Sequence, residues 1–176
     1  MNNEREHEAT NRPFYESIEI NKHSSYQLFI GELASDTLNE LYETCIHYDK
    51  KQLCIAATSP DIDSDLTFFL STAPVNTTVY IQGSEAFIWK LWQRVKVLGL
   101  VDEQIKMFQP ENKQRDLFCV HCFTTTHEVT QTPALCDDCQ RLLVVTEHFS
   151  KHHAAYMGYQ VNAENPTEIP DPKEFT

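Results

Sequence analysis

The sequence is short of glycine and of basic residues, and it has no long apolar run. Only four glycines occur among its 176 residues, and they form no Walker or GxGxxG loop for phosphates. No nucleophile elbow is present either. No apolar stretch approaches the ~20 residues of a membrane-spanning helix. We therefore expect a soluble, cytoplasmic protein that is not an enzyme by itself.

The charge balance limits the partners that the chain can bind. Lys and Arg number 14 against 26 Asp and Glu, which gives a net charge of -12. Such a surface repels phosphate backbones and anionic membranes, so we expect neither nucleic acid nor a membrane as partner. Hydrophobic residues make up 41% of the chain, enough for one ordinary core and a small additional module.

Four of the six cysteines form two CxxC hooks, Cys119 with Cys122 and Cys136 with Cys139. Each hook brings two thiolates toward one ion, and two hooks complete a tetrahedron. Four unrelated buried cysteines would not produce two identical spacings. Spacing of this kind in a reducing compartment indicates a metal site rather than disulfides.

Zinc is the ion that the pattern favours, in a structural site. Residues 123–135 between the hooks suit a short β-hairpin, as in a zinc ribbon, and four thiolates leave no open position for water or substrate. A single iron in a rubredoxin-like carrier is the alternative, whereas common iron–sulfur cluster spacings are absent. His121 and His127 lie nearby and are expected to be bystanders.

The first part of the chain alternates short apolar runs with helical patterns, which favours an α/β fold with parallel strands. Gly31 and Gly83 are expected at equivalent strand-to-helix turns. Strands are predicted over 26–31, 52–58, 77–81 and 104–108, and helices over 35–44 and 84–98. The expected domains are a flexible arm (1–13), an α/β domain (14–113), a zinc ribbon with a C-terminal helix (114–161) and an extended Pro-rich acidic tail (162–176).

Residues 146–157 are predicted to form that C-terminal helix, begun by Thr146 and ended by Gly158. His148 and His152 would then share one face, a spacing that can hold a metal or haem but that is more often a surface or interface pair. The role of the neighbouring His153 stays open. The tail is either disordered or wrapped around a partner.

Three further side chains carry expectations about burial. Cys45 and Cys54 belong to the α/β domain and are predicted to be buried free thiols, because core cysteine behaves as a small hydrophobe. Trp89 lies off the main apolar stripe of its predicted helix, so its ring is expected to be partly exposed.

A family resemblance is carried by the ribbon and the residues after it. The segments 118–122, 136–139, 147–150 and 155–158, with 79–89 upstream, resemble DmmA, the small subunit of bacterial haem-dependent dimethylamine monooxygenase. The resemblance implies a non-catalytic zinc-binding subunit of an NAD(P)H-dependent oxygenase that N-demethylates dimethylamine or a related small amine. Haem, flavin and iron–sulfur centres are then expected on partner subunits. A zinc-ribbon adaptor of an unrelated complex is the alternative.

Residues 79–108 are also similar to the last strand, helix and strand of the nicotinamide-binding lobe in ferredoxin-reductase-type enzymes, a small Rossmann-like fold. The turn of that family reads Cys-Gly-Pro, whereas this chain has Gln82-Gly83-Ser84. This difference argues against independent NAD(P)H binding. It leaves open whether Gly83 or Ser84 contacts the cofactor at all.

Overall fold

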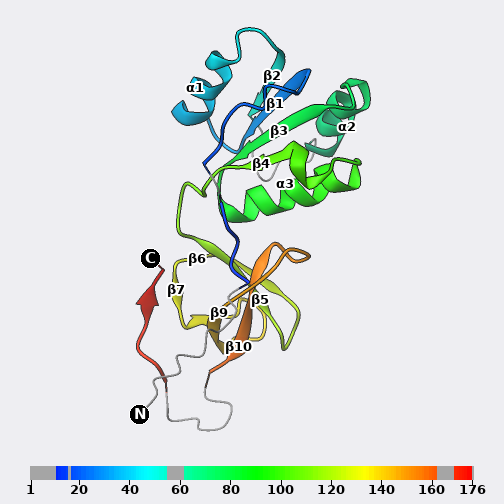
Figure 1. Cartoon of the computed structure of the whole chain (residues 1–176). Helices are drawn as coiled ribbons and strands as arrows, with labels where there is room; N and C mark the ends of the chain where they lie inside the picture. The colour runs from blue at the N-terminus through cyan, green and yellow to red at the C-terminus, as the bar shows by residue number, and fades with distance from the viewer. Residues whose placement is uncertain (1–10, 16, 55–61, 162–168, 176) are drawn as a thin grey trace, which may run out of the picture. The chain divides into compact units, whose positions relative to one another are not determined.

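The structure is a computed structural model that describes residues 11–15, 17–54, 62–161 and 169–175. The chain divides into two compact units, Tyr15–Gln114 and Arg115 onward, the second including the N-terminal segment up to Phe14. Each is described separately below, with the element labels of Figure 1. Within the described ranges, no helix has the length and apolar character needed to cross a bilayer.

The first unit is a four-stranded parallel sheet in the order β2-β1-β3-β4, as the alternating pattern predicts. Its strands are β1 (Tyr26–Gly31), β2 (Asp49–Cys54), β3 (Thr77–Gln82) and β4 (Ile105–Met107). The helices are α1 (Asp36–Thr44), α2 (Ile62–Thr72), α3 (Glu85–Val97) and the 3₁₀ turn η1 (Asp102–Gln104).

Helices cover both faces of this sheet. One core cluster joins Leu28, Val79 and Ile81 to Leu66 of α2 and to the apolar stripe of α3. The other joins Phe29 and Tyr80, whose rings stack at 4.7 Å, to Leu38 of α1. Burial on both faces explains why all six residues of β3 are buried and why the sequence shows no alternation there.

Two expectations for this unit are corrected by the structure, and the helix α2 was not predicted. Trp89 is only 3% exposed, and its Nε1 donates to the Tyr15 hydroxyl at 3.0 Å. Cys45 is buried as predicted, but Cys54 is exposed at the end of β2. The predicted strand residues 55–58 lie outside the described residues.

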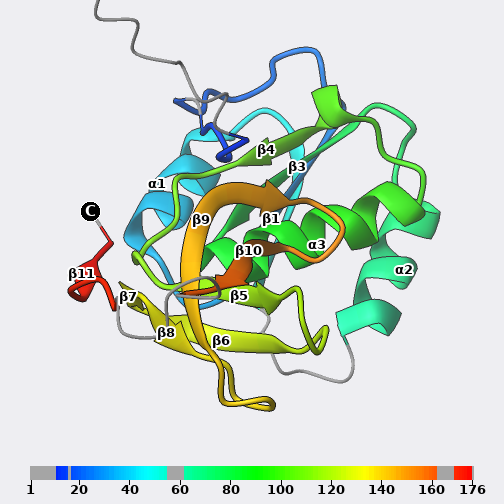
Figure 2. The same cartoon turned by 90° about the horizontal axis from the view of Figure 1, so that it is seen from below.

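The second unit is rich in β-structure. Its five-stranded sheet has the order β6-β5-β10-β9-β8, in which β5 and β10 are parallel and the other neighbours antiparallel (Figure 2). The strands are β5 (Arg115–Cys119), β6 (Thr125–Val129), β8 (Ala134–Leu135), β9 (Leu142–Ser150) and β10 (Ala155–Gln160). A separate pair joins β7 (Gln131–Thr132) to β11 (Lys173–Glu174).

The predicted C-terminal helix over 146–157 is wrong, because these residues form the β9–β10 hairpin. His148 lies on β9 and His152 in the turn, so they share no helical face. Gly158 lies inside β10 rather than at a helix end. A Cβ there would be 2.6 Å from Leu117 Cδ1, so close packing against β5 requires glycine.

The end of the tail packs on its own chain. Phe175 donates its backbone N–H to the Thr130 carbonyl at 3.2 Å, and its ring centroid lies 4.1 Å from the guanidinium carbon of buried Arg115. Tyr156 contacts the same guanidinium at 4.4 Å, and Glu147 forms an ion pair with it at 3.2 Å. The tail was expected to be extended and either disordered or wrapped around a partner, whereas β11 is ordered and pairs with β7 of the same chain. Residues 162–168 and 176 lie outside the described residues.

Candidate metal centre

The first hook is the turn of an antiparallel hairpin between β5 and β6. Phe123 donates its backbone N–H to the Cys119 carbonyl at 2.9 Å, and Cys119 donates to the Thr124 carbonyl at 2.9 Å. These two bonds close a tight loop. Phe123 takes a positive φ of 65° in it, a conformation that is uncommon for a residue other than glycine.

The second hook repeats this arrangement between β8 and β9. The backbone N–H of Gln140 donates to the Cys136 carbonyl at 3.1 Å, and the backbone N–H of Cys136 donates to the Arg141 carbonyl at 2.9 Å. Gln140 has a φ of 57°. The same CxxC spacing therefore gives the same backbone hydrogen bonds in both hooks. Residues 123–135, expected to be one hairpin, instead contribute β6, β7 and β8 to three different pairings.

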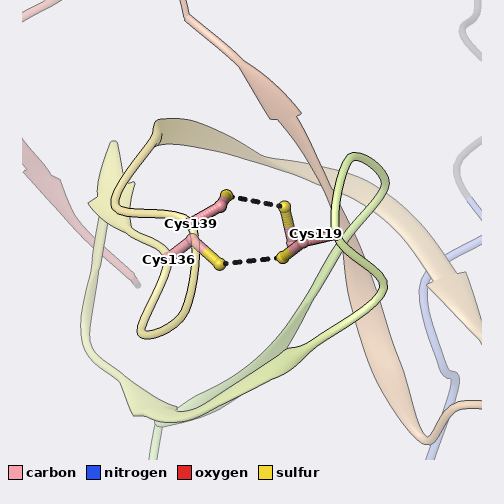
Figure 3. A group of neighbouring side chains, drawn as sticks. Cys119, Cys136 and Cys139 are labelled. Atoms are coloured by element: carbon pink, nitrogen blue, oxygen red, sulfur yellow. Dashed lines mark hydrogen bonds between the residues drawn. The ribbon is translucent and has the colours of Figure 1, made fainter.

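The two hooks bring the four predicted ligands together. All four Sγ atoms lie within 4.8 Å of one another, and Figure 3 shows labelled cysteine sulfurs facing a common centre. The Cys119–Cys139 and Cys122–Cys136 sulfurs are 3.8 and 3.5 Å apart. A disulfide needs about 2.05 Å, whereas tetrahedral zinc with bonds of about 2.3 Å requires sulfurs about 3.8 Å apart. The cluster therefore has the size of a metal site.

Burial and charge differ among the four thiols. Cys119 and Cys136 are buried, and the other two are half-buried. The backbone N–H of Thr124 lowers the pKa of Cys122 to about 6. Although a bond from the Arg141 backbone lowers the pKa of Cys139, desolvation and the neighbouring sulfurs raise it to about 12. Four thiolates cannot gather here without a cation to balance them, which is the role of a bound metal ion.

The chain fixes the hooks through contacts outside the cysteines. Val120 donates its backbone N–H to the carbonyl of Gly158 at 3.2 Å, which ties the first hook to β10. In the second hook, the backbone N–H of Asp137 donates to Thr126 Oγ1 at 3.0 Å, which links this hook to β6. Gln140 Nε2 donates to the Cys136 and Asp137 carbonyls at 3.1 and 2.9 Å. These contacts connect both hooks to the strands around them.

The nearby histidines stand apart from this cluster. His121 is exposed, and His127 Nδ1 lies 2.7 Å from Oδ2 of the buried Asp116. Neither ring belongs to the group of four ligand atoms. The sequence did not single out Phe123, which follows the first hook. Its side chain is 72% exposed, and its backbone takes a positive φ. Its only signal was its place directly after the second cysteine.

Fold and site together define a class: a two-unit protein in which an α/β unit precedes a β-rich unit with four convergent cysteines. Residues 116–159 match the family described as "Dimethylamine monooxygenase subunit DmmA-like, C-terminal domain". This segment contains both hooks. The resemblance to DmmA-like subunits predicted from the sequence is thereby confirmed for this segment.

A curated relative supports the same assignment. The chain is 34% identical over 113 residues to the "Heme-dependent oxidative N-demethylase delta subunit" of Ectopseudomonas mendocina (strain ymp). The match covers 61% of this chain and 65% of the relative, slightly less than two thirds of that protein's length. No solved structure matches the chain.

Proposed function

We propose that the chain is a non-catalytic, zinc-binding subunit of a multisubunit haem-dependent oxygenase that oxidatively N-demethylates dimethylamine or a related small amine. Two comparisons support this proposal. The C-terminal unit matches the DmmA-like domain family, and the similar protein from E. mendocina is named as the delta subunit of a haem-dependent oxidative N-demethylase.

The observation that carries the non-catalytic role is the closed set of four sulfurs. Catalytic zinc needs a position for water or substrate, and an ion held by four thiolates has none. Cys119, Cys122, Cys136 and Cys139 would hold the ion, which would supply rigidity to the turns of two hairpins. Zinc is favoured over iron because the site has no redox task in this proposal.

The resemblance to DmmA implies the partners. It implies haem on one partner subunit and flavin with an iron–sulfur centre on a reductase subunit, which would bring electrons from NAD(P)H to the haem for activation of O₂. Separate cofactors must be held at fixed distances and orientations. The role of this chain would be to fix that geometry through its second unit, which the metal ion would make rigid.

The test is a tagged purification of the full chain from its native host, with metal analysis of the product. We expect one zinc per chain, a colourless product when the chain is made alone, and haem-bearing and flavin-bearing subunits in the native preparation. The chain alone should show no amine-dependent O₂ consumption. Absence of haem and flavin partners would contradict the proposal, and a red iron-loaded chain would favour the rubredoxin-like alternative.

A further inference from the structure

The parallel sheet has a point at which bound ligands are usually found. Its strand order reverses between β1 and β3, and open α/β sheets bind ligands outside the carboxyl ends of the strands at such a point. Here β1 ends at Gly31 and is followed by Glu32, while β3 ends at Gln82 and leads through Gly83 into α3 (Figure 1). A dinucleotide would place its phosphates at this helix N-terminus.

Two of the backbone donors that would hold a phosphate there are already in use. Ser84 donates its backbone N–H to Glu32 Oε2 at 2.6 Å, and Phe87 donates to Ser84 Oγ at 3.3 Å. Glu32 is itself fixed, because its backbone N–H donates to the Gln82 carbonyl at 3.0 Å. The chain's own carboxylate thus lies where an anionic ligand would bind.

The space above the glycine of this turn is also filled. Gly83 has a φ of 156°, and a Cβ built on it would be 2.7 Å from Glu32 Cβ and 2.8 Å from Glu32 Oε2. In phosphate-binding turns, glycine lets the backbone approach the pyrophosphate. In this chain the side chain of Glu32 occupies the space beside Gly83 instead.

A further carboxylate and a second loop adjoin the same turn. Glu85, at the first position of α3, is 9% exposed and accepts a hydrogen bond from the Tyr15 hydroxyl at 2.8 Å. Glu111 donates its backbone N–H to the Gly83 carbonyl at 3.1 Å, which brings the loop after β4 to this edge. A pyrophosphate would therefore meet occupied donors, a filled space and negative charge.

We propose that Glu32 is a built-in anion that occupies the phosphate position of this sheet and closes it to dinucleotides. The NAD(P)H cofactor that the fold suggests does not fit the residues present. The unit keeps the architecture of a nucleotide-binding lobe while its own carboxylate satisfies the N-terminus of α3. This inference stands whether or not the chain is part of a demethylase.

The test uses the full chain with zinc bound and measures binding by calorimetry. The probes are NADH, NADPH and inorganic pyrophosphate, and the variants are Glu32→Ala and Glu32→Ser. Glu40→Ala, an exposed position on α1, is the matched control for loss of one negative charge. We expect no saturable binding by the parent chain or the control up to about 1 mM. The Glu32 variants should bind pyrophosphate at least about tenfold more tightly than this 1 mM limit.

Two results would overturn the proposal. One is saturable binding of NADH or NADPH by the parent chain, and the other is a folded Glu32 variant that gains no affinity for pyrophosphate. Glu32→Ser also empties the space beside Gly83, so it supplies the answer if Glu32→Ala does not fold. Amide NMR gives a second readout, in which the Ser84 N–H resonance should shift in Glu32→Ser and stay in place in Glu40→Ala.

Discussion

Replacing Phe123 with glycine is expected to stabilise the metal-loaded chain. Its φ of 65° places the residue in the left-handed region, which costs about 1–2 kcal/mol for a residue with a Cβ. Glycine removes that strain but gives the unfolded chain extra freedom, worth about 0.4–1 kcal/mol. The ring is 72% exposed, so its removal loses little burial. The net gain should be about 0.5–1 kcal/mol.

Phe123→Ala separates the backbone effect from the ring. Both variants lose the contact with Phe118, whose ring centroid is 6.2 Å away, but only the glycine variant relieves the strain. The glycine variant should therefore be more stable than the alanine variant by about 1 kcal/mol, a difference of a few degrees in Tm for a small domain. The assay is thermal unfolding of the zinc-loaded chain, followed by circular dichroism.

The second hook provides the matched control. Gln140 has the same backbone conformation, but its amide makes two hydrogen bonds to carbonyls of its own hook. Gln140→Gly loses both, at about 0.5–1.5 kcal/mol each, so it should not exceed the parent chain in stability. If Phe123→Ala were as stable as Phe123→Gly, the argument from backbone strain would be refuted.

Three more predictions follow from the site and the cores. Cys136→Ser should lose the stoichiometric ion and lower Tm by many degrees, as metal analysis and calorimetry would show, because metal-binding energy is also folding energy. Zinc affinity should fall as pH falls, because the bound thiolates must be deprotonated, and a chromogenic chelator would record the released zinc. Retention of zinc that does not change from pH 8 to about 4 would contradict this prediction. Iodoacetamide should modify exposed Cys54 well before Cys45, because burial raises the pKa of the Cys45 thiol and shields it; equal rates by mass spectrometry would contradict that packing.

Some of this architecture could be read from the sequence because local signals and burial agree. Residues 28–30 of β1 and 79–81 of β3 are continuous apolar runs, which is typical of strands buried on both faces. The α3 stripe and its start at Ser84 follow standard helix rules, and Ser84 does cap the helix by accepting from Phe87. The two CxxC hooks were found from spacing alone, and the structure brings their sulfurs together.

The β9–β10 hairpin could not be found in the same way. Its turn, residues 151–154, contains no glycine, proline or asparagine, and Ala154 takes the positive φ instead. The helical pattern over the histidines therefore decided the prediction. The alternating burial of Leu143 and Val145 along β9 is seen only in the structure. The hairpin belongs to a sheet in which β10 pairs with distant β5 and β9 pairs with β8, and local sequence does not encode such contacts.

The role of Glu32 was also hidden from the sequence. The residue follows a strand and resembles any surface carboxylate, and its partner Ser84 lies far along the chain. Only the parallel pairing of β1 with β3 brings the two loops to one edge. Contacts of this kind depend on topology, so they become visible only once the strand order is known.

The central claim is that four thiolates close around one zinc ion. X-ray absorption at the zinc edge of the purified, reduced chain tests it most directly. The prediction is one zinc per chain with four sulfur neighbours at about 2.3 Å and no lighter atom. An oxygen or nitrogen in the coordination sphere, or no bound metal at all, would contradict it.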